Sequence, residues 1–352
     1  MTSFEPDFRH MVDAVRNVRP TRLPVYEHII NPGFMEQLFG YPFAELANGD
    51  DADLDRFFEH YCRFWREMTY DTVSYEVCIT EILPGGGALL GEHPGPIQSR
   101  ADFERYPWDE LPARFWATAE RRFRALARAM PPGMKALGGV GNGIFEISED
   151  LVGYEYLAYM AHDDPELYAD LYRKIGDLMV AIWEEFLRRH TDLFVVCRFG
   201  DDLGYKVSTL VAPRTLRAHV VPQIRRIADL IHAAGRPFLW HSCGNIFSIM
   251  EDAIAAGIDA KHSNEDVIAP FDTWIARYGD RIGLLGGVDV DILCRDTPEA
   301  IFERVVEMGR RFRATARGYA LGSGNSIPDY VPVEGYVAMI RAAQHLRAEE
   351  AA

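Results

Sequence analysis

The sequence predicts a single (β/α)8 barrel, an α/β fold in which eight parallel strands alternate with helices. Three observations favour this prediction: short apolar segments recur along the chain, helix-length segments separate them, and no Ser/Gly-rich linker divides the 352 residues. We expect one domain over 1–352, with an N-terminal helical extension at about 1–20. A doubly wound open sheet is the alternative, but "YEHIINPGF" at 26–34 lacks its Gly-rich phosphate fingerprint.

The predicted strands are short runs of apolar and β-branched residues, most of which lead into Gly, Asp, Asn or Ser. They are 23–29, 72–77, 135–141, 193–199, 237–242, 257–263, 282–289 and 318–323. Two of the intervening segments carry clear helix signals. Segment 213–235 repeats apolar residues every three or four positions and ends on Gly235, which is typical of helix C-termini. Segment 296–314 has Thr297 as N-cap and Pro298 as its first helical residue.

Composition narrows the classes of function. The formal net charge of −16 argues against nonspecific binding to nucleic acid or to anionic membranes. The five cysteines are scattered and odd in number, without a CxxC pair, so a reducing cytoplasm is expected. We find no signal peptide and no 18-residue apolar window. The sequence therefore predicts a cytoplasmic protein that acts on a small molecule.

Polar residues gather at the ends of the predicted strands, where (β/α)8 barrels carry their active sites. Part of this set is expected to serve only as caps for the helices that follow. The set comprises Glu27, His28, Glu76, Asn142, Asp201, Asp202, His241, Cys243, His262, Glu265, Asp266, Asp289, Asp291, Ser323, Asn325 and Ser326.

The segment "PFLWHSCGNI" at 237–246 places His241 and Cys243 two positions apart as a strand ends. Residues two apart on a strand point the same way, so imidazole and sulfur are expected to converge. Together they are good ligands for an ion such as Zn²⁺. The alternative is structural: His241 bonds a neighbouring carboxylate and Cys243 fills a small buried gap.

Further candidates follow the strand at 193–199. Asp201 and Asp202 are adjacent carboxylates, so one of them can have a raised pKa and act as an acid or base, unless both are caps. Arg198 and Cys197 face opposite sides, and an inward Arg198 can pair with either aspartate or hold a substrate carboxylate. His262 can contact substrate or orient Glu265. The remaining candidates for substrate binding are Glu76, Asn142, Asp289 and Asn325.

The motifs "GDDLG", "PFLWHSCGNI", "LLGGVDVD" and "GSGNSIPDYVPVE" make the chain similar to the uroporphyrinogen decarboxylase superfamily. The resemblance covers 190–345 well, and it is nearer to the cobalamin-dependent, zinc-containing methyltransferases than to the decarboxylases. It implies a (β/α)8 barrel, zinc, and a corrinoid that a partner protein supplies or that binds at the barrel mouth. It also favours a homodimer.

In that branch, a His-x-Cys pair and a later cysteine hold the zinc, and His241 and Cys243 match the pair. The third ligand does not match, because the position near Asn325 carries no cysteine and none occurs over 295–352. Glu27, at the end of the first predicted strand, is the substitute that we expect, and it is also a candidate catalytic carboxylate. The decarboxylases use arginines after this strand to hold an acidic tetrapyrrole, whereas 26–34 contains no arginine.

Three functions follow from these observations. The first is methyl transfer between a corrinoid and a small-molecule donor or acceptor, in a demethylation system and with assistance from a metal. The second is a cofactor-independent decarboxylase or lyase that acts on a small carboxylate. It needs an inward cation, for which Arg198, Lys206 and Lys261 are the candidates. The third is a binding protein without catalysis, which the many ionisable residues at strand ends make less favourable.

Overall fold

The computed structural model describes residues 4–91 and 93–351, and at its centre lies a parallel sheet of seven strands. The strands pair in chain order, from β1 to β7, without a reversal. A doubly wound sheet reverses its strand order, so that alternative is wrong. The strands are β1 (Thr72–Cys78), β2 (Lys135–Gly141), β3 (Phe194–Gly200), β4 (Phe238–His241), β5 (Ala260–His262), β6 (Gly283–Val288) and β7 (Tyr319–Ser323).

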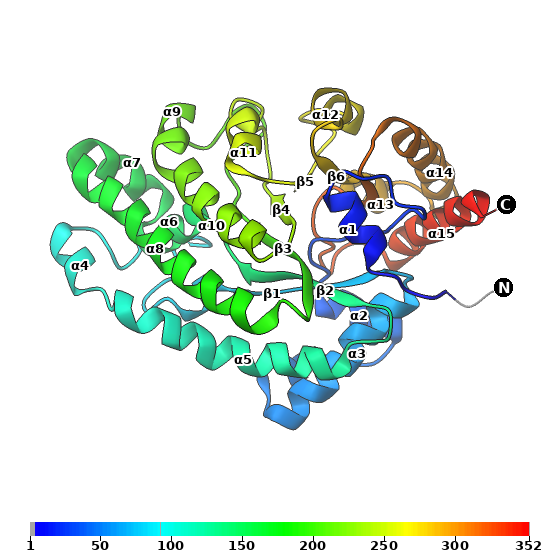
Figure 1. The fold of residues 1–352 in the computed structure, drawn as a ribbon, viewed down its shortest axis with the longest axis horizontal. Helices are drawn as coiled ribbons and strands as arrows, with labels where there is room; N and C mark the ends of the chain where they lie inside the picture. The colour runs from blue at the N-terminus through cyan, green and yellow to red at the C-terminus, as the bar shows by residue number, and fades with distance from the viewer. Residues whose placement is uncertain (1–3, 92, 352) are drawn as a thin grey trace.

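Helices cover the outside of this curled sheet and follow one another around it in chain order (Figure 1). The helices before β3 are α1 (Arg9–Val15), α2 (Pro32–Phe39), α3 (Asp51–Glu67), α4 (Arg100–Arg105), α5 (Leu111–Ala129), α6 (Ile144–Val152), α7 (Tyr154–Asp163) and α8 (Pro165–His190). Those after it are α9 (Pro213–Thr215), α10 (Val221–Ala233), α11 (Met250–Ala256), α12 (Phe271–Tyr278), α13 (Val290–Arg295), α14 (Pro298–Thr315) and α15 (Val333–Glu350).

The α/β class is confirmed, but a full eight-stranded barrel is not. In place of the predicted strand at 23–29, the structure has isolated parallel bridges, from Val25 to Leu321 of β7 and from Ile30 to Ile327, just beyond β7. Two local features limit its pairing. Pro24 has no backbone N–H to donate, and the carbonyl oxygen of His28 accepts from side chains instead of from a neighbouring strand.

Local sequence signals explain how the two predicted helices form. The side chain of Thr297 caps α14 by accepting a hydrogen bond from the backbone N–H of Ala300 at 3.3 Å. The segment 213–235 is helical as expected, but it contains a π-helical stretch, Leu216–Val220, between α9 and α10. Pro222 lies just after this stretch, and because it lacks an N–H it cannot continue the regular hydrogen-bond pattern.

Helix α1 closes the N-terminal end of the curled sheet. Its buried residues Met11, Ala14 and Val15 share an apolar cluster with residues from the strands, among them Leu239 and Leu285. Of the predicted extension at about 1–20, residues 1–3 lie outside the described part of the chain. Within 4–20, the helix that the structure shows is α1. Because this end is filled by packed side chains, a site open to solvent must lie at the opposite, C-terminal end of the strands.

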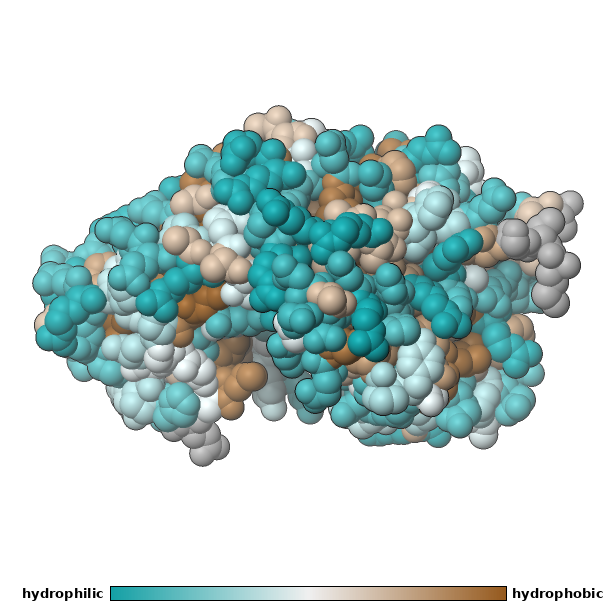
Figure 2. All heavy atoms as spheres, turned by 90° about the horizontal axis from the view of Figure 1, so that it is seen from below, coloured by the Kyte–Doolittle hydropathy of each residue, from teal (hydrophilic) through white to brown (hydrophobic). Residues whose placement is uncertain are grey.

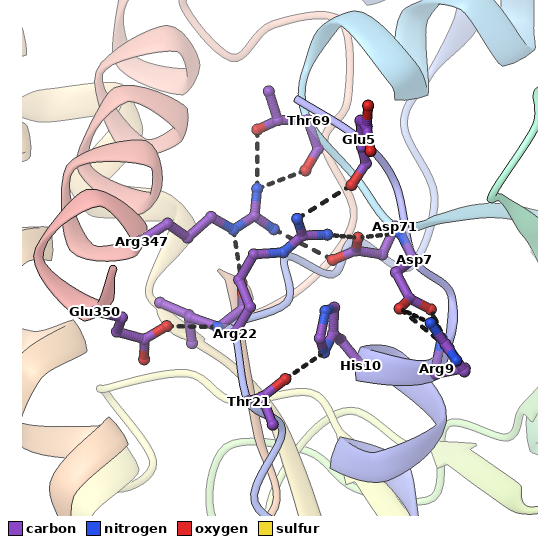
Figure 3. A network of polar contacts seen from close by, with 11 residues as sticks. Glu5, Asp7, Arg9, His10, Thr21, Arg22, Thr69, Asp71, Arg347 and Glu350 are labelled. Carbon is purple, nitrogen blue, oxygen red and sulfur yellow. Dashed lines mark hydrogen bonds and ion pairs between the residues drawn. The ribbon is translucent and has the colours of Figure 1, made fainter. Parts of the chain in front are cut away.

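A buried network of charges ties the two ends of the chain to the start of β1 (Figure 3). Its centre is Asp71, which is fully buried and accepts hydrogen bonds from the backbone N–H of Asp7 at 2.9 Å and from the guanidinium of Arg22. Arg347 of α15 lies 3.5 Å from the other Asp71 oxygen and donates to the carbonyl oxygens of Leu23 and Thr69. One carboxylate, that of Asp71, therefore joins chain segments that lie far apart in sequence.

The surface shows little apolar area on the face seen from below, where apolar residues form small separate areas between hydrophilic ones (Figure 2). Among the described residues, no helix combines the length and the apolar character that a membrane crossing needs.

Candidate metal centre

The pair singled out from the sequence, His241 and Cys243, lies at the end of strand β4. His241 is the last residue of β4 and is 4% exposed, and Cys243 follows two residues later. The Sγ atom of Cys243 lies 3.3 Å from Nε2 of His241. Imidazole and sulfur therefore converge, as the alternation of side chains along a strand predicts.

Asp202, in the loop after β3, completes a group of three ligand atoms. Its Oδ1 accepts a hydrogen bond from the backbone N–H of Cys243 at 2.9 Å and lies 3.7 Å from Nε2 of His241. The ligand atoms of Asp202, His241 and Cys243 all lie within 4.8 Å of one another. The carboxylate side chain is 43% exposed, so the group is reachable from solvent.

The hydrogen bonds around His241 fix which of its nitrogens carries the proton. Nε2 of His262 lies 2.9 Å from the carbonyl oxygen of Ser323, which can only accept, so this nitrogen is protonated. Nδ1 of a neutral His262 must then accept, and it lies 2.8 Å from Nδ1 of His241. His241 therefore donates from Nδ1 and keeps a lone pair on Nε2, which faces Cys243 and Asp202. This is how partner groups orient a metal-binding histidine in proteins.

The electrostatics of the site keep both imidazoles neutral. Burial, with His262 as the next cause, holds the pKa of His241 well below its usual value. Burial also lowers the pKa of His262 to about 3. Burial raises the pKa of the Cys243 thiol, and the neighbouring Asp202 carboxylate raises it further. A cation among these groups would therefore favour the thiolate that metal binding requires.

These donors fit a tetrahedral metal ion. With usual zinc–ligand lengths, tetrahedral geometry places neighbouring N, O and S ligand atoms about 3.4–3.6 Å apart. The observed 3.3 Å and 3.7 Å separations bracket that range. Ser263 Oγ and Asn325 Nδ2 each lie 3.5 Å from Cys243 Sγ and can donate to it. One position of a tetrahedral ion held by Asp202, His241 and Cys243 would remain for a ligand.

His28 is a neighbour of this centre whose role the sequence left open. Its ring stacks on His241 with centroids 3.7 Å apart and planes 10° apart, and with His241 and His262 it forms a second, fully buried group of candidate ligands. Its Nδ1 is buried without a hydrogen-bond partner among the described residues. The sequence did carry a signal for the position of His28. Side chains alternate along an extended segment, so Tyr26 and His28 point to one side and Glu27 points to the other.

Glu27 does not take the place that we expected from the sequence. It belongs to neither group of candidate ligands, and its oxygens accept instead from the backbone N–H of Ser323 at 2.8 Å and from the Ser323 hydroxyl. Burial raises the pKa of Glu27 to about 8. The carboxylate that groups with the His–Cys pair is instead that of Asp202, which makes Asp202 the candidate for the third ligand.

The raised pKa of Glu27 has a consequence for stability. Between pH 4.5 and about 8, the folded protein keeps a proton on Glu27 that the unfolded chain releases. We therefore expect this residue to lower the free energy of unfolding by up to about 1.4 kcal/mol per pH unit as pH rises through this window. Glu27→Gln should flatten the dependence in urea denaturation at pH 5 and pH 8, with Glu155→Gln, on the exposed part of α7, as the control. Parallel curves for Glu27→Gln and wild type would contradict this expectation.

Arg198 points inward but is already paired. It is completely buried and contacts Glu76 of β1, with Nη2 and Oε2 2.6 Å apart. Its Nη1 donates to the hydroxyl of Ser74, the carbonyl oxygen of His28 and the hydroxyl of Tyr26. The expected pairing with the aspartates after β3 does not form. Arg198 and Glu76 together join β1, β3 and the segment before α2 beneath the metal centre.

Asp201 and Asn142 connect neighbouring loops. Asp201 is buried, and its carboxylate accepts from the backbone N–H groups of Phe145 and Glu146 at 3.0 and 3.1 Å, at the start of α6. This is the capping arrangement that the sequence left as the alternative to catalysis. Asn142 accepts from Thr80 and donates to Glu146 at 2.9 Å. Both residues therefore hold the loops around the centre in place.

A cavity of about 780 Å³ opens beside the centre and includes two of the expected substrate contacts, Asp289 and Asn325. Asn325 links it to the ligand group, since its Nδ2 lies 3.5 Å from Cys243 Sγ. The volume is in the usual range for small-molecule sites. The structure thus places the candidate ligands next to a space that can hold a substrate.

The hydrogen bond between the two histidines predicts an effect on metal binding. His262→Phe removes the acceptor for Nδ1 of His241 and frees that ring to turn or to change tautomer. We expect zinc affinity to fall about 10- to 100-fold, as measured by competition with a chromophoric chelator. His262→Gln keeps an acceptor and should lose less. Unchanged zinc affinity in His262→Phe would show that this hydrogen bond does not orient the ligand.

Comparisons with known proteins add the following findings. The sequence model of uroporphyrinogen decarboxylase (URO-D) matches residues 52–346. No curated protein matches the chain significantly. A methyltransferase from Methanosarcina mazei superposes with a TM-score of 0.72 at 15% identity, covering 97% of this chain and 99% of that chain. Xylanase B from Clostridium stercorarium F9 reaches a TM-score of 0.45 at 10% identity, covering 96% and 99%. At 15% identity, the similarity to the first indicates a shared fold.

Proposed function

Because this chain belongs to the uroporphyrinogen decarboxylase family, we propose that it is a metal-assisted methyltransferase of that family, which moves a methyl group between a corrinoid and a small molecule in a demethylation system. The observation that carries the proposal is the ligand group of Asp202, His241 and Cys243, with a lone pair on His241 Nε2 directed at the other two. A cofactor-independent decarboxylase has no need of such a group.

The donor set of one imidazole, one sulfur and one carboxylate suits zinc. Bound there, zinc would supply a Lewis acid that lowers the pKa of a thiol or polarises an oxygen of the substrate. The chain's own residues would prepare this chemistry. His262 holds the His241 ring, Ser263 and Asn325 donate toward the Cys243 sulfur, and Asp202 contributes its carboxylate from the solvent side.

The corrinoid would reach the centre from the open end of the strands, carried by a partner protein or bound at that mouth. Exposed apolar side chains support a docking partner, since Tyr205 and Val207 after β3, Val267 after β5 and Tyr330 after β7 are 60–81% exposed. We further propose that the segment 23–30 completes the rim of this mouth. The segment lies beside β7 and contributes His28. We also propose that the protein forms the homodimer that its family resemblance favours.

The decarboxylase alternative is less well supported, because two of its three candidate cations are occupied. The N–H groups of Arg198 all contact Glu76, Ser74, Tyr26 or a backbone carbonyl. Lys261 is buried, donates to the carbonyl oxygen of Ser263 and lies over the Trp274 ring. Lys206 alone of the three lines the cavity, among several carboxylates.

The test has two parts. The purified protein, expressed with zinc in the medium and dialysed, should hold about one zinc per chain by elemental analysis. With methylcobalamin as donor and a panel of small thiols and phenols as acceptors, demethylation of the cobalamin should appear as a change in its visible spectrum. A protein that holds no metal and transfers no methyl group to any acceptor would overturn the proposal. Carbon dioxide release from small carboxylates without metal would favour the decarboxylase instead.

A further inference from the structure

We propose that the cavity beside the metal centre binds a small organic cation that also carries an oxygen acceptor, such as a quaternary ammonium alcohol. This inference names a substrate class for the same site and therefore rests on the proposed function. It excludes small carboxylates and sulfonates as the preferred ligands. Three features of the cavity support this inference: the charges that line it, one unpaired amide and one aromatic ring.

The charge of the cavity is the first observation. Five carboxylates and three cationic side chains line it. Two of the cations are already paired, Arg295 with Asp291 at 3.1 Å and Arg304 with Asp296 at 3.4 Å. The remaining cation is Lys206, which is exposed to solvent. After these pairs are discounted, three carboxylates face one lysine, so the cavity favours a positive ligand.

Two of these three carboxylates are uncommitted. Asp289 uses its oxygens to accept from the backbone N–H groups of Asp266 at 2.7 Å and Asp291 at 2.8 Å, which fixes the loop. The side chains of Glu265 and Asp266, by contrast, make no ion pair or side-chain hydrogen bond within the described part of the chain. Burial and then the Asp289 charge raise the pKa of both. A bound cation would relieve this repulsion, and no such relief comes from an anion or a neutral ligand.

Asn264 is an independent sign that a ligand belongs here. It lines the cavity and is 4% exposed, and its Oδ1 accepts from the backbone N–H of Gly287 at 2.9 Å. Its Nδ2 is buried without a partner among the described residues. A buried donor left unpaired loses its hydrogen bonds to water without replacement, which is unfavourable. An oxygen acceptor on the ligand would satisfy this amide while the charged end lies at Glu265 and Asp266.

Tyr330 adds an aromatic surface to the same cavity. Its side chain is 72% exposed and lines the wall formed by the loop after β7. Aromatic rings beside carboxylates are the usual surroundings of quaternary ammonium groups, because the ring face attracts the positive charge. Through Asn325, the same loop reaches the Cys243 sulfur. The oxygen end of such a ligand can therefore lie toward the metal centre.

The test compares three probes of similar size by titration calorimetry with the purified protein. These are choline, its uncharged isostere 3,3-dimethylbutan-1-ol, and the anion 3-hydroxypropane-1-sulfonate. We expect choline to bind at least about 10-fold more tightly than either of the others. In the double variant Glu265→Gln/Asp266→Asn the preference for choline should fall below about threefold. Glu303→Gln, which removes an exposed carboxylate of α14 outside the cavity, should keep the wild-type preference.

Three results would overturn the inference: equal binding of choline and its neutral isostere, tighter binding of the sulfonate, or no binding of any probe. Thermal unfolding of the double variant checks that it folds, which is expected because neither side chain has a partner to lose. The calorimetry needs no turnover. A preference for choline in a protein without zinc or methyl transfer would therefore support the cation site and overturn only the proposed reaction. Methyl transfer without a preference for choline would support the reaction and overturn only the cation site.

Discussion

Cys243→Ala is expected to lower zinc affinity about 100-fold or more and to abolish methyl transfer from methylcobalamin. Removing a ligand should cost at least as much as the 10- to 100-fold loss that follows when a supporting residue of a metal site is removed. The variant leaves only His241 and Asp202 of the ligand group. Elemental analysis after dialysis and the spectral assay of cobalamin demethylation measure the two effects.

Cys294→Ala is the matched control for this variant. Cys294 is also partly buried and lines the cavity beside the centre, but it belongs to neither group of candidate ligands. It should therefore retain zinc. A Cys243→Ala protein with a full complement of zinc would show that the sulfur is not a ligand. Retained zinc with lost activity would place the sulfur in the reaction instead of the metal site.

Asp71→Asn is expected to lower the free energy of unfolding by about 3–5 kcal/mol, which is a large part of the stability of a typical domain. The substitution keeps the shape of the side chain but removes the charge that balances Arg22 and Arg347. Arg347 is 9% exposed, and burial already lowers its pKa to about 10. Without Asp71, this guanidinium is left as an uncompensated buried charge. Urea denaturation followed by circular dichroism gives the measurement.

The control for Asp71→Asn is a similar pair on the surface. Asp272 accepts two hydrogen bonds from Arg311 at 3.0 Å, and its side chain is 46% exposed. Water screens such a pair, so Asp272→Asn should cost less than about 1 kcal/mol. If the two variants lose the same stability, the buried network in Figure 3 does not hold the chain ends as described.

The alternation of side chains along a strand was sufficient to predict part of the site. It placed His241 and Cys243 on one side of a strand end, and the structure brings their ligand atoms to 3.3 Å. The same rule placed Arg198 opposite Cys197, but it said nothing of what Arg198 would meet. Its partner is Glu76, which is more than a hundred residues away in sequence, on β1. Alternation fixes the face of a side chain, whereas its partner depends on which strands are neighbours.

The carboxylate of the ligand group shows the same limit. The sequence suggested Glu27, because it ends the first predicted strand, yet Glu27 and His28 face opposite sides and His28 takes the inner one. Asp202 stands beside His241 because β3 and β4 are paired, with Gly200 opposite His241. This register brings the residues just after β3 next to those after β4. Only the folded sheet decides such distances.

By itself, the sequence determined the alternation of strands and helices, the ends of most strands, and the His-x-Cys pair, because these depend on periodicity and on local turn and cap residues. The tertiary structure alone decided that Asp202 joins the pair, that His262 fixes the tautomer of His241, and that an acidic cavity lies beside them. The physical reason is that coordination and charge depend on distances of a few ångströms between groups on different strands. Strand pairing and packing set these distances, and local sequence does not encode them.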